Sequence, residues 1–377
     1  MSESAPLSGI KVVELARVLA GPWAGQVLAD LGAEVIKVES PSGDDTRSWG
    51  PPFIENADGT KDAAYFHAAN RGKSSLTADF RTDEGKQLVL DLVRDADVVI
   101  ENFKLGGLAK FGLDYPSLSA INPRLVYCSI TGFGQDGPYA PRPGYDFIVQ
   151  GMSGMMDLTG EPDGPPMKIG MAYADILTGL YGVIGIQAAL HQRETTGRGQ
   201  HVDMALFDVM VGTLANQAMN YLVSGEVPHR LGNAHPNIVP YQAFQASDGW
   251  VIVAVGNDRQ FARFSAQMGL EQRPEWATNP GRVADRAALC PAIEEKTRGW
   301  TRDALLQALE DERIPCGPIH DVGEALSDPQ ILARGMLLDM QRKDGTRIPG
   351  LRTPIVFSDA KLATGTPSPE LGSGRKT

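Results

Sequence analysis

Asp175 is a lone carboxylate at the start of a long apolar stretch, in Gly170-Met-Ala-Tyr-Ala-Asp175-Ile-Leu-Thr178-Gly179. Burying an uncompensated carboxylate is costly, so such a group must be capped, paired or chemically used. One interpretation is a helix cap, because Asp accepts hydrogen bonds from the free N–H groups of a first helical turn. The other is a catalytic carboxylate. This segment alone favours neither.

Basic side chains in the first third of the chain fall at or near junctions between apolar segments, where they could converge on a small anion. They are Arg17, Lys37, Arg47, Arg71, Lys73, Lys104 and Lys110. A solvated basic surface is the alternative for each of them. The formal net charge of −11 argues against a nucleic-acid partner, whose phosphates require a basic face.

The cysteine and glycine patterns argue against metal and dinucleotide sites. Cys128, Cys290 and Cys316 are far apart and lack metal-ligand spacing, so we expect neither a disulfide framework nor a metal site. The run Gly132-Phe-Gly134-Gln-Asp-Gly137 fits the GxGxxG dinucleotide pattern. Prolines at 138, 141 and 143 forbid the helix that would hold a pyrophosphate, so we expect no NAD.

The composition is that of a soluble globular protein, with 377 residues, 42% of them hydrophobic and 21% charged. This length allows two domains. The apolar stretch 176–190 is short for a bilayer and predicts a buried helix. Residues 1–6 lack the basic flank and apolar core of a signal peptide. We therefore expect a cytoplasmic protein with no membrane partner.

Apolar periodicity predicts strands that alternate with helices in the first half of the chain. The expected strands are 10–15, 34–38, 98–101, 125–131 and 200–206, and the expected helices are 23–31, 84–95, 105–111 and 207–224. This order predicts an α/β fold with a Rossmann-like, doubly wound parallel sheet. Such sheets bind ligands at the carboxyl ends of their strands. These ends hold Ala16-Arg17, Glu39-Ser40, Asn102-Phe103 and Gly132-Phe-Gly134.

A smaller α+β domain is predicted after the Pro-, Asn- and His-rich loop 227–240. Strands 241–245 and 250–255 flank the turn Ser247-Asp-Gly249, and helices follow at 258–268, 285–297 and 301–312. We expect a large α/β domain over 1–225, the small domain over 226–330, and a return segment with a tail over 331–377.

Taken together, these segments resemble the family III CoA-transferases from Leu7 to about Leu371. The matching motifs are Ala16-Arg-Val-Leu-Ala20-Gly-Pro22, Gly32-Ala-Glu-Val-Ile-Lys37-Val-Glu39, Gly43-Asp-Asp-Thr-Arg47, Asn70-Arg-Gly-Lys73-Ser, Glu101-Asn-Phe103 and Gly170-Met-Ala-Tyr-Ala-Asp175. Formyl-CoA transferase, carnitine CoA-transferase and α-methylacyl-CoA racemase belong to the same superfamily. Segments 43–53, 127–132, 232–244 and 314–319 look most like the succinyl-CoA:glutarate branch.

The resemblance implies that Asp175 attacks an acyl-CoA thioester, giving a mixed anhydride and then an aspartyl-CoA thioester. Succinyl-CoA would be the donor, and a dicarboxylate such as glutarate the acceptor. Coenzyme A would enter as an acyl-CoA substrate, without a metal or NAD. The family's interlocked homodimer is also expected.

The resemblance also implies a set of binding residues. CoA contacts would fall on Val18, Leu19, Ala20, Ser40, Asn70, Arg71, Lys73, Asn102, Phe103 and Lys110, with Tyr145 and Asp146 near the reacting thioester. Lys73, Lys110 and Arg71 suit the phosphates of CoA. Arg17 and His235 are candidates for the distal carboxylate of the acceptor, and Gly256 is a further substrate candidate. Phe103 could instead be a core residue, and His235 could simply shape its loop.

Departures from the family pattern narrow the chemistry. Leu19 replaces a Gln, Ser40 replaces an Arg, and the loop at Gly256 lacks a glycine run, all of which disfavours formyl or oxalyl transfer. A racemase needs a base on each side of the α-carbon. Tyr145 stands where racemases have a His, and its phenol is a poor base near neutral pH. A non-catalytic CoA-binding protein is the remaining alternative.

Overall fold

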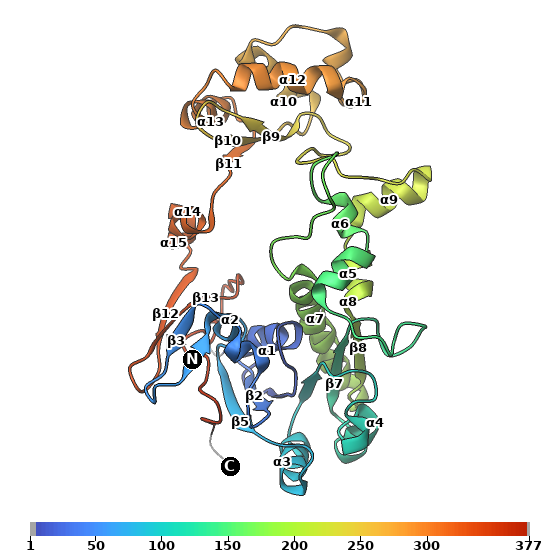
Figure 1. The fold of residues 1–377 in the computed structure, drawn as a ribbon, viewed down its shortest axis with the longest axis vertical. Coiled ribbons are helices and arrows are strands. Elements are labelled where there is room, and N and C mark those ends of the chain that lie inside the picture. The colour runs from blue at the N-terminus through green and yellow to red at the C-terminus, as the bar shows by residue number, and fades with distance from the viewer. Residues whose placement is uncertain (1–4, 375–377) are drawn as a thin grey trace. The chain divides into compact units, whose positions relative to one another are not determined.

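A six-stranded, wholly parallel sheet is the centre of the computed structural model, which describes residues 5–374. Its strand order is β5-β2-β1-β6-β7-β8 (Figure 1). The strands are β1 (Lys11–Glu14), β2 (Glu34–Glu39), β5 (Lys73–Thr77), β6 (Val98–Glu101), β7 (Val126–Thr131) and β8 (His201–Ala205). Counted within the sheet, this is the 3-2-1-4-5-6 order of doubly wound folds, which confirms the predicted α/β class.

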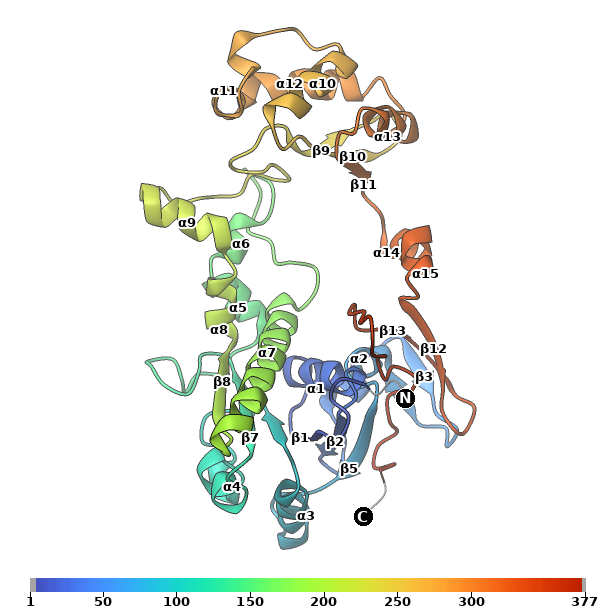
Figure 2. The same ribbon diagram turned by 180° about the vertical axis from the view of Figure 1, so that it is seen from behind.

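Helices cover both faces of the sheet. Helices α1 (Ala20–Asp30) and α7 (Tyr173–Thr196) lie side by side on one face, and α3 (Asp83–Arg94) and α4 (Tyr115–Ile121) lie on the other (Figure 1, Figure 2). Strand β6 shows why both faces must be covered. Val98 and Ile100 belong to the core under α1 and α7, whereas Val99 belongs to the opposite core. A strand buried on both sides reads as a continuous apolar run.

Two sequence-based expectations for this region are wrong. The helix expected at 105–111 is only the short 3-10 turn η2 (Ala109–Phe111). The helix expected at 207–224 is two helices, α8 (Leu206–Gly212) and α9 (Ala215–Ser224), and Ala215 at the break has a φ of 48°. A strand that was not predicted is present at Lys73–Thr77. It is polar because it lies at the edge of the sheet, so its sequence lacks the apolar run of a central strand.

Shorter elements connect these parts. They are η1 (Asp45–Ser48), β3 (Phe53–Glu55), β4 (Lys61–Ala63), α2 (Ala64–Ala68), α5 (Asp146–Met152), α6 (Met155–Leu158), α15 (Pro329–Ala333), β12 (Leu337–Gln341) and β13 (Arg347–Leu351). β12 and β13 form an antiparallel hairpin in the predicted return segment. Beyond it, the tail covers the edge of β5, where Gly374 N donates to Ser75 O at 2.7 Å.

The chain divides into two compact units. The first contains the residues up to Met155, Lys168–Met219 and those from Pro329 onward, and the second contains Met156–Met167 and Asn220–Asp328. The expected boundaries at 225/226 and 330/331 thus lie a few residues beyond these divisions. Inclusion of Met156–Met167 in the second unit has no counterpart in the prediction.

The second unit has its own core around the antiparallel sheet β11-β10-β9. The predicted hairpin is present as β9 (Tyr241–Gln245) and β10 (Trp250–Ala254). The other elements are β11 (Cys316–Pro318), α10 (Asp258–Met268), η3 (Pro274–Trp276), α11 (Asn279–Ala284), α12 (Arg286–Thr297), α13 (Arg302–Asp311) and α14 (Val322–Ser327). This composition is the α+β unit that the sequence predicts.

Helix α7 is longer than the apolar stretch that predicts it, with 24 residues and an 18-residue window of mean hydropathy 1.3. Length and composition alone would let it cross a membrane. A core helix of a globular domain has the same properties, and α7 packs against α1 and contributes Val183, Ile186 and Ala189 to the core.

Candidate active site

Asp175 is the third residue of α7, in its first turn. The N-cap residue is Ala172, whose methyl side chain cannot accept a hydrogen bond. Asp146, the first residue of α5, does this task, because its Oδ1 accepts the N–H of Ala174 at 2.8 Å. Within residues 5–374 the Asp175 carboxylate has no hydrogen-bond donor or ion-pair partner of its own. The structure therefore does not support the helix-cap interpretation.

The environment of Asp175 disfavours its charge. Burial removes water from the carboxylate and, together with the negative charge of Asp146, raises the pKa of Asp175 to about 7. Asp146 stays in place because Gln150 Nε2 donates to its Oδ2 at 2.7 Å. A poorly solvated carboxylate that ionises near neutral pH is an effective nucleophile.

Tyr65 is a neighbour of this carboxylate that the sequence analysis missed. It lies in α2 and packs edge-on against Trp49, with ring centroids 5.4 Å apart. Burial raises the pKa of Tyr65, and the negative charges of Asp175, Asp146 and Asp44 raise it further. The phenol thus stays protonated as a hydrogen-bond donor near Asp175. Its sequence context, Ala-Tyr-Phe-His-Ala, carries no signal beyond that of a core segment.

The first loop, Arg17-Val18-Leu19, connects β1 to α1. Val18 has a φ of 68°, a left-handed conformation that costs a β-branched residue about 1–3 kcal/mol. Asn102 fixes the preceding residue, because its Oδ1 accepts Arg17 N at 2.8 Å and its Nδ2 donates to Arg17 O at 2.6 Å. This amide is therefore engaged with the backbone rather than free for a ligand.

Helix α7 touches the end of the first loop one turn after Asp175. A Cβ atom on Gly179 would lie 2.6 Å from the carbonyl oxygen of Ala20, so only glycine permits this approach. Leu19 and Ala20 are both buried. The first loop and Ala20, which together hold three of the predicted CoA-binding residues, therefore adjoin the first two turns of the helix that carries Asp175.

A cavity of about 280 Å³ opens at the carboxyl ends of β1, β2 and β5. Three aromatic rings stand together beside it, since Phe80 lies 6.2 Å from Phe103 and 6.3 Å from Phe111. Arg17 lies 5.5 Å above the ring of Phe103. An aromatic wall with guanidinium groups at its rim suits a planar base that carries phosphates.

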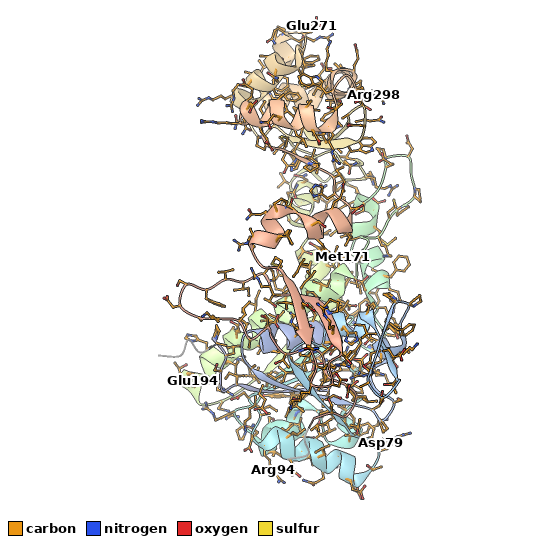
Figure 3. The ribbon with its side chains drawn as sticks, turned by 90° about the vertical axis from the view of Figure 1, so that its left-hand side faces the viewer. Asp79, Arg94, Met171, Glu194, Glu271 and Arg298 are labelled. Carbon is orange, nitrogen blue, oxygen red and sulfur yellow. The ribbon has the colours of Figure 1, made fainter. Side chains whose placement is uncertain are left out.

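Some of the lining residues match the prediction and others were missed. Arg17, Ser40 and Phe103 line the cavity, and so does the segment from Ala78 to Arg81, which was not predicted. Asp79, labelled in Figure 3, lies between β5 and α3 and pairs with the exposed Arg81. This segment was missed because β5 was not recognised as a strand, so its carboxyl end was not placed with the others.

Four of the predicted anion-binding side chains are instead buried in ion pairs. They are Lys37, Arg47, Arg71 and Lys73. Each pairs with at least one carboxylate. Lys37 pairs with Glu14 and Asp44, and Lys73 also pairs with Glu14. Arg47 pairs with Glu39 and Asp62, and Arg71 pairs with Asp30. A buried cation paired with a carboxylate is a weaker attractor for a phosphate than a free one. The expected contacts of Arg71 and Lys73 with CoA stay predictions.

The amide of Asn70 belongs to the same buried group, since it donates to Phe66 O and its Oδ1 accepts from Lys73 Nζ. Lys104 and Lys110, in contrast, are exposed. Lys110 Nζ lies 4.7 Å above the ring of Phe111, next to the aromatic cavity. Among the predicted lysines, Lys110 therefore remains a candidate for a CoA phosphate.

The remaining candidates have local partners or open surroundings. Ser40 is exposed and its hydroxyl contacts Ser42, and Tyr145 is 65% exposed. In the second unit, His235 Nδ1 accepts Asn237 N at 3.1 Å, and the imidazole packs against Tyr241. Gly256 N donates to Gln260. The contacts of His235 shape its own loop, and its role toward a substrate stays a prediction.

Comparison with known proteins identifies relatives along nearly the whole chain. The pattern of CoA-transferase family III matches residues 7–375. The succinate–glutarate CoA-transferase of Agrobacterium fabrum is 59% identical over 97% of this chain and 93% of its own. The human succinyl-CoA:glutarate CoA-transferase is 38% identical over 99% of this chain and 85% of its own.

A solved structure agrees with this assignment. The crystal structure of a CAIB/BAIF family protein from Brucella suis is 62% identical in sequence and superposes with a TM-score of 0.89. The match covers 98% of this chain and 97% of that one. The similarity therefore extends through both units and the return segment.

Proposed function

Because this chain belongs to CoA-transferase family III, we propose that it moves CoA from succinyl-CoA to glutarate through a covalent intermediate on Asp175. The names of relatives at 59% and 38% identity support the two substrates. The observation that carries the mechanism is the Asp175 carboxylate, which is partly buried, has no hydrogen-bond or ion-pair partner among residues 5–374, and has a pKa raised to about 7.

The first half of the reaction loads CoA onto the enzyme. An Asp175 oxygen attacks the carbonyl carbon of the succinyl thioester, the C–S bond breaks, and the thiolate of CoA leaves. The product is a mixed anhydride of Asp175 and succinate. The thiolate then attacks the Asp175 carbonyl carbon, so that succinate departs as a carboxylate and an aspartyl-CoA thioester remains.

The second half repeats these steps with the acceptor. A glutarate carboxylate attacks the aspartyl thioester, which releases the thiolate and forms a second anhydride. The thiolate attacks the glutaryl carbonyl carbon, giving glutaryl-CoA and regenerating the Asp175 carboxylate. Every intermediate stays activated, so no ATP is consumed, and a buried site protects it from water.

The groups around Asp175 suit this chemistry. The phenol of Tyr65 is protonated and can donate to the oxyanion that develops at each carbonyl. The cavity beside Phe80, Phe103 and Phe111 would take the adenine, with Arg81 or Lys110 toward the phosphates. Arg17 and His235 remain our candidates for the distal carboxylate of the acceptor.

We also infer a homodimer. The resemblance implies it, and exposed apolar side chains such as Ile184, Leu222 and Val223 are consistent with further burial in an assembly. Light scattering coupled to size-exclusion chromatography should give twice the chain mass of 40.5 kDa. A mass of one chain at micromolar concentration would contradict the inference.

The transfer itself is tested by mass spectrometry of the CoA thioesters. Purified protein is incubated with succinyl-CoA and each of glutarate, malate, itaconate, acetate and formate. We expect glutaryl-CoA from the native protein and none from Asp175→Ala. Asp208→Ala is the matched control, since Asp208 is an exposed acidic residue in the first turn of α8. Product formation by Asp175→Ala would overturn the proposal.

A further inference from the structure

The strained backbone of Val18 has a specific anchor. Its N–H points to the carboxylate of Asp44, with N–O distances of 3.4 and 3.2 Å to Oδ1 and Oδ2. Asp44 is 26 residues further along the chain, in the loop before η1. A non-glycine residue with a left-handed φ persists only where its surroundings hold it there, and such strain is often found at functional sites.

Asp44 is itself fixed by buried partners. Lys37 Nζ lies 2.9 Å from Asp44 Oδ2, and Thr46 donates to Oδ1 through both its N–H and its hydroxyl, at 3.0 and 2.8 Å. Lys37 is 1% exposed and also donates to Ala16 O at 2.9 Å. The backbone is therefore held on both sides of Arg17, by Lys37 at Ala16 and by Asp44 at Val18.

The first loop links this anchor to the helix that carries Asp175. The loop that Asp44 holds continues into Ala20, which touches α7 at Gly179. A shift of Val18 would thus move the loop against the helix that carries Asp175.

We propose that Asp44 is a positioning residue for CoA transfer, which acts by holding Val18 in its left-handed conformation. Asp44 lines the aromatic cavity, but Lys37, Thr46 and Val18 already occupy its oxygens. It therefore acts through the first loop rather than on the substrate. The inference rests on the proposed function of Asp175. It assigns to the Gly43-Asp-Asp-Thr-Arg47 motif the role of holding the backbone of the first loop.

A double-mutant cycle tests this coupling. Asp44→Asn weakens the anchor, and Val18→Gly removes the need for it, because glycine adopts a positive φ without strain. We expect Asp44→Asn to lower kcat by about 10-fold to 100-fold, as a displaced loop would. In the Val18→Gly background the same change should cost at most about 3-fold. An equal cost in both backgrounds would show that Asp44 does not act through Val18 and would overturn the proposal.

Hydrogen exchange gives a readout that needs no activity. Peptides spanning residues 16–23 should exchange about 10-fold faster or more in Asp44→Asn, because Val18 N loses its acceptor. Asp45→Asn is the matched control, since Asp45 has an exposed carboxylate in the same motif, and among residues 5–374 its ion-pair partner is Arg17 alone. Unchanged exchange in Asp44→Asn would refute the anchor.

Failure of a variant to fold and failure of the proposed function can each be distinguished from failure of this proposal. If Asp44→Asn does not fold, Thr46→Val removes one hydroxyl bond to Asp44 and is taken through the same cycle with the same criteria. If the native protein transfers no CoA from any donor while the exchange result holds, the proposed function fails and the anchor of Val18 stands.

Discussion

Two carboxylates near the start of α7 have separate tasks. Asp146 satisfies the backbone of the first turn from a neighbouring helix, which leaves Asp175 unengaged. A sequence can show that an acidic residue stands before an apolar stretch, but it cannot show which of two acids caps the helix. The set of family motifs along the chain was needed to nominate Asp175 as the nucleophile, whereas Asp146 as the cap required the structure.

The raised pKa of Asp175 predicts the pH dependence of transfer. Only the ionised carboxylate attacks the thioester, so kcat/KM should fall tenfold per pH unit below about pH 7 and level off above it. The negative charge of Asp146 raises this pKa, so Asp146→Asn should move the acidic limb to lower pH. Initial rates of both proteins from pH 5 to 9 measure the position of the acidic limb in each. A limb near pH 4 in the native protein would contradict the prediction.

The same shift predicts a gain in stability on neutralising Asp175. The pKa of Asp175 is raised on folding, so the native protein loses stability as the pH rises from about 4 to 7. Asp175→Asn should be more stable than the native protein at pH 8, by at most about 4 kcal/mol. The difference should shrink toward pH 4. Urea unfolding at pH 5 and pH 8 measures it, and a gap that widens at low pH would have the wrong sign.

At the scale of the elements, the sheet was predictable where its strands are apolar and not where they are polar. Strands β1, β2, β6 and β7 each contain at least two consecutive apolar residues, such as Val-Val-Ile in β6, but β5 reads Lys-Ser-Ser-Leu-Thr. The ion pairs of two predicted anion-binding residues also join segments that are distant in the sequence. Lys73 pairs with Glu14, 59 positions away, and Arg71 pairs with Asp30, 41 positions away. No local pattern distinguishes such a buried cation from one that binds a phosphate.

Two glycines of α7 give a matched prediction about helix packing. A Cβ on Gly179 would meet the Ala20 carbonyl at 2.6 Å, whereas one on Gly182 would find only ordinary contacts at 3.8 Å or more. Gly179→Ala should therefore destabilise the fold by about 1–3 kcal/mol and reduce transfer. Gly182→Ala should be neutral or stabilising by up to about 1 kcal/mol. Thermal unfolding and CoA-transfer rates of the pair decide this, and equal effects would contradict the prediction.

At the scale of the whole molecule, the first unit is completed by the C-terminal return segment. Arg47 Nη2 donates to Pro369 O, and the imidazole of His67 contacts Ser368 Oγ at 2.5 Å. The sequence indicated a return because strand-like segments follow the last helices. It could not show the contacts of the tail with β5, since tail residues rich in Pro, Gly and Ser carry no pairing pattern.

Truncation after Ala363 should test how much this tail contributes to stability. The deletion removes the tail contacts of Arg47, His67 and the edge of β5 named above. We therefore expect a melting temperature several degrees lower, because each kcal/mol of lost stability lowers it by roughly 2–4 °C in a chain of this size. Increased light scattering on heating should accompany it. A truncated protein with native melting behaviour would mean that these contacts add little.

The edge of β5 is unpaired for part of the time during which the chain is synthesised. Ser75 leaves the ribosome long before Gly372, its partner 297 positions later, and Gly374 follows. At roughly 5–20 residues per second, the unpaired edge waits about 15–60 s for its cover. Newly made chains thus carry an unpaired edge until Gly372 and Gly374 have been synthesised. A chain that stops before these residues would keep that edge exposed for pairing with other chains.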